Sequence, residues 1–90
     1  ILIIVVTMDK EMGAVVAGPD IVSRGFVYVR ESEELMEEAK EKVKMALEKC
    51  EDNNITEWAV IKSNVRDALG RYLYERTRRR PMILPIIMEI

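Results

Sequence analysis

Apolar residues open the chain in one nearly continuous run over residues 1–8, most of them β-branched. A short run of this kind, bounded by turn residues, predicts a buried strand, and its continuity predicts a central strand covered on both faces. The charged stretch 9–13 ends in Gly13, a residue type that readily adopts positive φ. Residues 14–17 are therefore expected to return as the second arm of a hairpin.

Turn residues reappear at Gly18-Pro19-Asp20, which predicts a reversal of the chain. The stretch 26–29 alternates weakly and is interpreted as a short edge strand. The chain closes with a second apolar run over residues 82–90. That run is far shorter than the roughly 20 apolar residues that cross a bilayer. We therefore expect it to form a strand beside the first one.

Helical spacing dominates the middle of the sequence. Ser32 is predicted to be the N-cap of a first helix that ends at 51–54, with Glu38 and Lys42 as a supporting i,i+4 pair. Thr56 is predicted to cap a second helix, which Pro81 ends. The apolar stripe of the first helix is Met36, Ala39, Val43, Ala46, Leu47 and Cys50. That of the second helix is Trp58, Ile61, Val65, Leu69, Tyr72 and Leu73. Both stripes predict one buried face per helix.

Taken together, these elements predict a single α+β domain over residues 1–90. The economical arrangement is a two-layer sandwich in which two helices pack on one face of a small mixed sheet of three to four strands. Gly70 is a weak point of the second helix, because glycine costs about 1 kcal/mol relative to alanine in a helix interior. A small domain with two strongly apolar strands is also expected to bury a sheet edge or face against another subunit.

Composition excludes several kinds of chemistry. The chain has no histidine and a single cysteine, Cys50. It therefore offers no Ser-His-Asp or Cys-His catalysis, no imidazole base and no thiolate zinc site. The carboxylates show no catalytic spacing, so a free-standing enzyme would need chemistry from Asp, Glu, Lys or Ser alone. A lone buried cysteine fits a reducing cytoplasm. The start in mid-strand indicates a piece of a longer polypeptide with no membrane span.

Charge divides the chain into two unlike halves. Residues 32–52 carry eight acidic residues and four lysines, a balance of −4, whereas residues 56–80 carry seven basic and three acidic residues, a balance of +4. Two interpretations remain open: arginine forks suit phosphate, so the basic side chains could contact RNA, or they could pair with the acidic helix or another subunit. Trp58 and Tyr72 lie in the apolar stripe and are expected in the core. The candidate RNA or subunit contacts are Lys62, Arg66, Arg76, Arg78, Arg79 and Arg80.

The chain resembles the C-terminal domain of bacterial ribonuclease J in three stretches and at Trp58, all in the same order. The stretches are 18–31, 61–67 and 74–89. This family comprises metallo-β-lactamase-type ribonucleases with a β-CASP insertion, which act as 5′-to-3′ exonucleases and endonucleases in mRNA decay and rRNA maturation. The resemblance implies that zinc is held by His and Asp motifs in catalytic domains outside this chain. It therefore assigns no catalytic, cofactor or metal residue here.

The same resemblance implies an accessory role for the chain. In the family this domain supports homodimer assembly and full activity. The implied partners are the parent's catalytic domains and a second copy, with direct RNA binding by the basic second helix as the alternative. The implied location is the cytoplasm.

Overall fold

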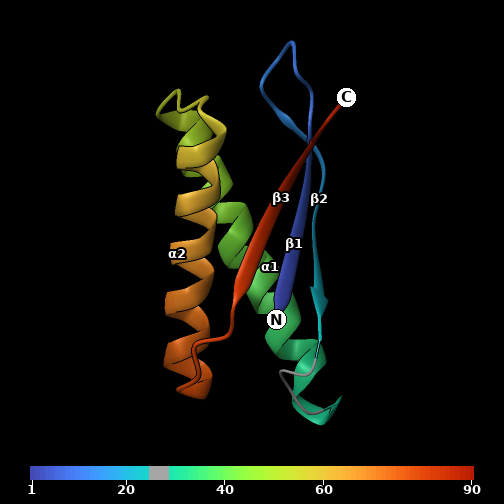
Figure 1. Cartoon of the computed structure of the whole chain (residues 1–90), viewed down its shortest axis with the longest axis vertical. Coiled ribbons are helices and arrows are strands. Elements are labelled where there is room, and N and C mark those ends of the chain that lie inside the picture. The colour runs from blue at the N-terminus through green and yellow to red at the C-terminus, as the bar shows by residue number, and fades with distance from the viewer. Residues whose placement is uncertain (25–28) are drawn as a thin grey trace.

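The computed structural model describes residues 1–24 and 29–90, and it confirms the predicted α+β architecture. The three strands form a mixed sheet in the order β2-β1-β3, with β2 antiparallel and β3 parallel to the central strand. Both helices pack on one side of this sheet (Figure 1). The predicted pairing of the last strand with the first is confirmed. The elements are β1 (Leu2–Met8), β2 (Val15–Ser23), α1 (Val29–Asp52), α2 (Trp58–Thr77) and β3 (Ile83–Glu89).

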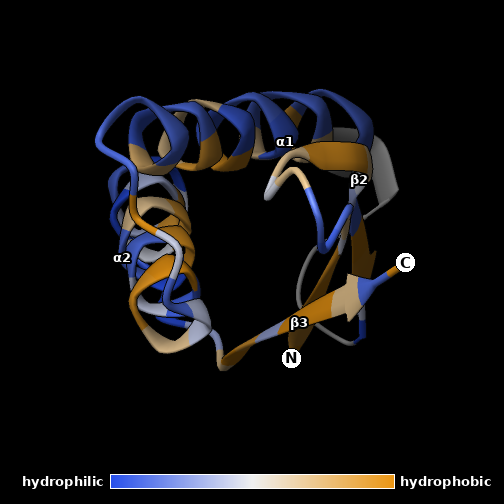
Figure 2. Ribbon diagram, turned by 90° about the horizontal axis from the view of Figure 1, so that it is seen from above, coloured by the Kyte–Doolittle hydropathy of each residue, from blue (hydrophilic) through white to orange (hydrophobic). Residues whose placement is uncertain are grey.

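The central strand β1 is covered on one face, not on both as expected. Leu2, Ile4, Val6 and Met8 are buried, and the residues between them are only half-buried. The alternation follows from the strand period of two, because successive side chains point to opposite faces and the helices cover only one. Figure 2 shows the hydrophilic sides of the helices turned outward and the strands largely hydrophobic.

The predicted turn at Gly18-Pro19-Asp20 is wrong, because these residues continue through β2. The pairing register with β1 shifts between Val5 and Thr7, so the strand absorbs an irregularity here and does not reverse. Gly18 has φ of +94°, and a Cβ there would lie 2.8 Å from the Val5 carbonyl oxygen. Glycine is therefore required by close backbone approach inside the sheet. The Gly18–Pro19 peptide bond is cis.

The predicted start of the first helix is also corrected. A short edge strand was predicted over residues 26–29. Residues 26–28 lie outside the described part of the chain, and Val29 belongs to α1. The helix thus begins three residues before Ser32, which is not an N-cap. Glu38 forms an ion pair with Arg76 of α2, and the charge of Lys42, its predicted i,i+4 partner, helps to lower the pKa of the Glu38 carboxyl.

The second helix begins and ends differently from the prediction. Its N-cap is Glu57, not Thr56. It ends at Thr77, before Pro81, because Arg78 adopts a left-handed conformation with φ of 59° and donates its backbone N–H to the Tyr74 carbonyl oxygen. A left-handed residue satisfies an end carbonyl and stops the helix without proline.

The helices and β1 share one core. Trp58 was expected in it but is 39% exposed, since it stands in the first turn of α2 beyond the packed stripe. Met36 and Ala46 are half-buried. Cys50 is buried, as expected, and burial raises the pKa of its thiol. The buried helical residues are Leu35, Ala39, Val43, Leu47, Cys50, Ile61, Val65, Leu69, Tyr72 and Leu73.

No helix in the described ranges is both long enough and apolar enough to cross a membrane.

Candidate interaction surfaces

The face of the sheet turned away from the helices carries an apolar surface, here called the open sheet face. Its register is set by the parallel pairing of β1 with β3, which places Ile3 opposite Leu84 and Val5 opposite Ile86. Leu84 is 46% exposed and Ile86 is 38% exposed. Asp20 lies opposite Val5 and adds a carboxylate. The apolar and hydroxyl members of this face are Ile3, Val5, Thr7, Val22, Leu84, Ile86 and Met88.

The outer edge of β3 is interrupted by Pro85. The Leu2 N–H donates to the Met82 carbonyl oxygen at 2.8 Å, and the Ile90 N–H donates to the Met8 carbonyl oxygen at 3.0 Å. In a parallel ladder, alternate residues bond to the same neighbour, so Pro85 has its nitrogen on the outer edge. Proline supplies no donor there, and the edge is a poor template for another strand.

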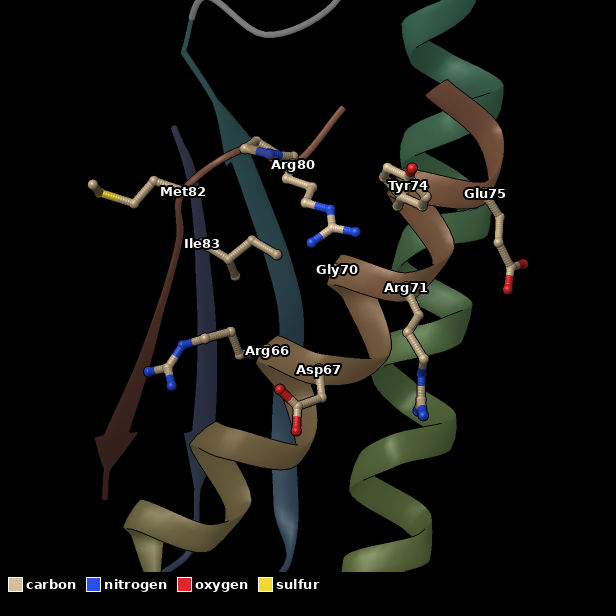
Figure 3. Close-up of a pocket in the computed structure, with 10 residues that line it drawn as sticks. Arg66, Asp67, Gly70, Arg71, Tyr74, Glu75, Arg80, Met82 and Ile83 are labelled. Atoms are coloured by element: carbon tan, nitrogen blue, oxygen red, sulfur yellow. The ribbon is translucent and has the colours of Figure 1, made fainter. Parts of the chain in front are cut away.

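A second surface lies between α2 and β3, here called the basic groove. Its volume is about 800 Å³. In Figure 3, the Arg66 side chain extends from α2 toward β3, and Arg80 reaches from the connecting loop toward α2. The return of the chain after Arg78 places both arginines along the same groove. The lining residues are Arg66, Asp67, Gly70, Arg71, Tyr74, Glu75, Arg80, Pro81, Met82 and Ile83.

Tyr74 holds the arginines at one end of the basic groove. The Arg80 guanidinium lies 4.5 Å from the centre of the Tyr74 ring, and that of Arg78 lies 5.4 Å from it. Such contacts are attractive because the ring face is electronegative. They restrict two long side chains that would otherwise move freely in solvent.

Gly70 forms part of the groove wall without any side chain. A Cβ at this position would meet only the Ile83 Cδ1 atom within 4 Å, at 3.7 Å, which is ordinary contact. Neither its backbone conformation nor its neighbours therefore require glycine. Its helical cost of about 1 kcal/mol has no packing explanation.

Arg76 lies outside the basic groove, on the side of α2 that faces α1. It donates to Glu38 of α1 and, at 3.2 Å, to the Tyr72 hydroxyl, which itself donates to Glu38. The Tyr72 hydrogen bond, followed by the charge of Arg76, lowers the pKa of the Glu38 carboxyl against the effect of desolvation. Burial and the bond to Glu38 raise the pKa of Tyr72 to about 12. This cluster joins the two helices.

The six predicted contact residues therefore divide among several places. Arg66 and Arg80 line the basic groove, and Arg78 stacks on its tyrosine. Lys62 is half-buried one turn before Arg66, and the Arg79 backbone N–H donates to the Thr77 hydroxyl. Sequence reasoning missed Gly70 and Tyr74 as parts of this surface. Gly70 lies four residues after Arg66 and Tyr74 lies eight after it, and this spacing was the available signal, because it places all three on one side of a helix.

Among the residues that the structure describes, no three His, Cys, Asp or Glu side chains gather into a group that could hold a metal ion.

Comparison with known proteins identifies relatives along the entire chain. The family model of the ribonuclease J C-terminal domain matches residues 1–90. Ribonuclease J2 of Bacillus subtilis is 50% identical over all 90 residues, and ribonuclease J 2 proteins of Staphylococcus epidermidis and Staphylococcus aureus are 53% and 52% identical. The chain covers 16% of the length of each of these relatives.

Proposed function

Because the chain belongs to the ribonuclease J C-terminal domain family, we propose that it is the accessory domain through which two copies of such a ribonuclease assemble. In this proposal the chemistry resides elsewhere in the parent, as zinc-dependent exonucleolytic and endonucleolytic cleavage of RNA in cytoplasmic mRNA decay and rRNA maturation. In this proposal the parent's catalytic domains hold the zinc, because the residues described here show no grouping that fits a zinc site.

The observation that carries the proposal is the open sheet face. Leu84, Ile86 and Met88 are each more than a third exposed, although they occupy a strand of the sheet. A sheet buries apolar side chains efficiently when a second sheet stacks on it at about 10 Å. Removing contiguous apolar surface of this kind from water is favourable at roughly 25 cal/mol per Å².

A second copy of this chain is the occupant that the surface fits best. A two-fold axis through an apolar face pairs each patch with itself, so the face needs no complementary partner. Pro85 makes strand pairing at the outer edge of β3 unfavourable, so the proposed mode of contact is face-to-face packing of the sheets and not pairing at this edge. Assembly would then place α1 and α2 of each copy on the two outer sides.

The test uses the full-length ribonuclease that carries this chain. We expect Ile86→Asp to convert a dimer into a monomer in light scattering, because a carboxylate would be buried in an apolar interface. Leu84→Gln is a milder second variant at the same face. Met45→Asp is the matched control, since Met45 is also exposed but lies on α1.

Loss of the dimer in the sheet variants, but not in Met45→Asp, supports the proposal. An unchanged mass in both sheet variants, or in a parent lacking residues 1–90, would overturn it. If the mass of a sheet variant is unchanged but its catalytic domains melt at a lower temperature, the open sheet face packs against the catalytic domains of the same chain.

A further inference from the structure

We propose that the basic groove between α2 and β3 holds a segment of single-stranded RNA, with Arg66 and Arg80 at its phosphates. One premise comes from family membership, namely that the parent ribonuclease acts on RNA. Assembly through the open sheet face is not required. Three features of the groove support RNA binding: its arginines, its tyrosine and its glycine.

The arginines supply phosphate recognition from two separate elements. Arg66 comes from the middle of α2, and Arg80 comes from the loop that precedes β3. Each guanidinium offers several donors in a planar fork that matches phosphate oxygens. In Figure 3, Arg66 extends toward β3 and Arg80 toward α2, with Ile83 between them, so the two arginines would contact separate phosphates of one RNA strand.

The cation–π pair of Arg80 and Tyr74 supplies an aromatic ring and a guanidinium that are already in contact. With the guanidinium 4.5 Å from the ring centre, Arg80 is held by Tyr74 and does not have to be ordered by the ligand. Unpaired bases stack favourably on aromatic rings and on arginine planes. Pro81, Met82 and Ile83 continue the groove with apolar surface, on which a base can also rest.

The glycine keeps the wall of the groove clear. Alanine at residue 70 would have room, and it would favour the helix. Gly70 lowers the stability of the helix, and packing gives no reason for a glycine there. A ligand that must approach the helix backbone closely at this position would give one. A sugar–phosphate segment lying between Arg66 and Tyr74, the residues one turn away on either side, is such an occupant.

The carboxylates favour RNA over an acidic peptide. Asp67 and Glu75 also line the groove, and they can accept hydrogen bonds from ribose hydroxyls and from the amino groups of bases. The side chains of an acidic peptide are acceptors and offer no such donors at neutral pH. In a run of glutamates, only the backbone N–H groups could donate to Asp67 and Glu75, whereas RNA offers donors on both its riboses and its bases.

The experiment titrates the chain with a fluorescein-labelled single-stranded RNA of about ten nucleotides and follows anisotropy at about 50 and about 200 mM salt. We expect binding that weakens with salt, and a loss of about tenfold in affinity for Arg66→Ala and for Arg80→Ala. Lys44→Ala is the matched control, because it removes one exposed positive charge from α1. Its affinity should stay within about twofold of wild type.

Gly70→Ala and the Tyr74 variants separate a ligand site from general electrostatics. Gly70→Ala should raise the stability of the fold and lower the affinity for RNA, although it changes no charge. Tyr74→Leu should weaken binding, and Tyr74→Phe should restore it, because phenylalanine keeps the ring under Arg80.

Three results would overturn the proposal. The first is an equal loss of RNA affinity in Lys44→Ala and in the groove arginine variants. The second is undiminished RNA binding by Gly70→Ala. The third is binding of a labelled oligoglutamate that is as tight as binding of the RNA. The last result would assign the groove to an acidic protein segment.

Discussion

Gly18 and Gly13 both adopt positive φ, of +94° and +68°, but only Gly18 lies against the backbone of a neighbouring strand. An added Cβ at Gly18 would meet the Val5 carbonyl oxygen at 2.8 Å, whereas one at Gly13 would meet nothing within 4 Å. We expect Gly18→Ala to lower the free energy of unfolding by more than about 2 kcal/mol, and Gly13→Ala by about 1 kcal/mol. Urea denaturation of both variants measures this difference. Equal losses would show that φ alone decides the effect.

Tyr72 gives the fold a dependence on alkaline pH. Its pKa is raised from 10.0 to about 12, so the folded chain keeps a proton that the unfolded chain has released. Stability must then fall as pH rises from 10 to about 12, because the native state binds more protons in that window. In Tyr72→Phe this decline should be smaller, and the free energy of unfolding at neutral pH should drop by about 1 kcal/mol through the lost hydrogen bond. Tyr74→Phe is the control, and denaturation series across this pH range provide the measurement. An unchanged decline in Tyr72→Phe would contradict the assignment.

The cluster around Tyr72 also makes the stability of the fold depend on acidic pH. The pKa of Glu38 is lowered in the fold, so its contribution is present above its ordinary pKa of 4.5 and is lost as pH falls through the lowered value.

At the scale of elements, a substitution at the N-cap of α2 should stabilise this helix. Glu57 is the N-cap, with φ of −75° and ψ of 122°, yet within the described chain its side chain makes no capping bond. Glu57→Ser would place a short hydroxyl acceptor beside the first N–H groups of the helix. We expect the free energy of unfolding to rise by about 0.5–1 kcal/mol in thermal or urea denaturation. Thr56→Ala should have little effect, because Thr56 is not the cap. The reverse ranking would restore the cap to Thr56.

The elements also show how far sequence patterns reach. Periodicity predicted most of both helical stripes, apart from the exposed Trp58 and the buried Leu35. The apolar pattern also predicted the return of the last strand beside the first, because burial of an apolar face decides these features. Local rules failed where long-range pairing prevailed. Gly18-Pro19 has the composition of a turn, but pairing with β1 draws it into a strand. Pro81 marks a helix boundary, but the left-handed Arg78 ends the helix earlier.

The candidate site was harder to predict than the fold, for a geometric reason. The arginines at 66 and 80 were identified as contacts from charge alone. Their placement along one groove depends on the direction in which β3 leaves the end of α2, and no local pattern encodes that direction. Arg76 belongs to the same charged stretch but turns toward Glu38, because the side facing α1 lies on a different part of the helix.

At the scale of the whole molecule, the two proposed surfaces lie on different sides of the chain and should act independently. The open sheet face uses Leu84 and Ile86, whereas the basic groove uses Ile83 and the side of α2 that bears Arg66. In a strand, neighbouring side chains point to opposite faces, so Ile83 and Leu84 contribute to different surfaces.

We therefore expect Ile86→Asp to abolish the dimer in the full-length ribonuclease while affinity of the chain for single-stranded RNA stays within about twofold. Arg66→Ala should do the opposite, lowering RNA affinity by about tenfold with no change in mass. Light scattering of the full-length protein and anisotropy of the chain test the two halves separately, and the double variant should show the sum of both effects. If either single variant changed both measurements, the surfaces would be coupled. In that case one partner would have to cover β3 on both faces, and the separation of assembly from RNA contact would fail.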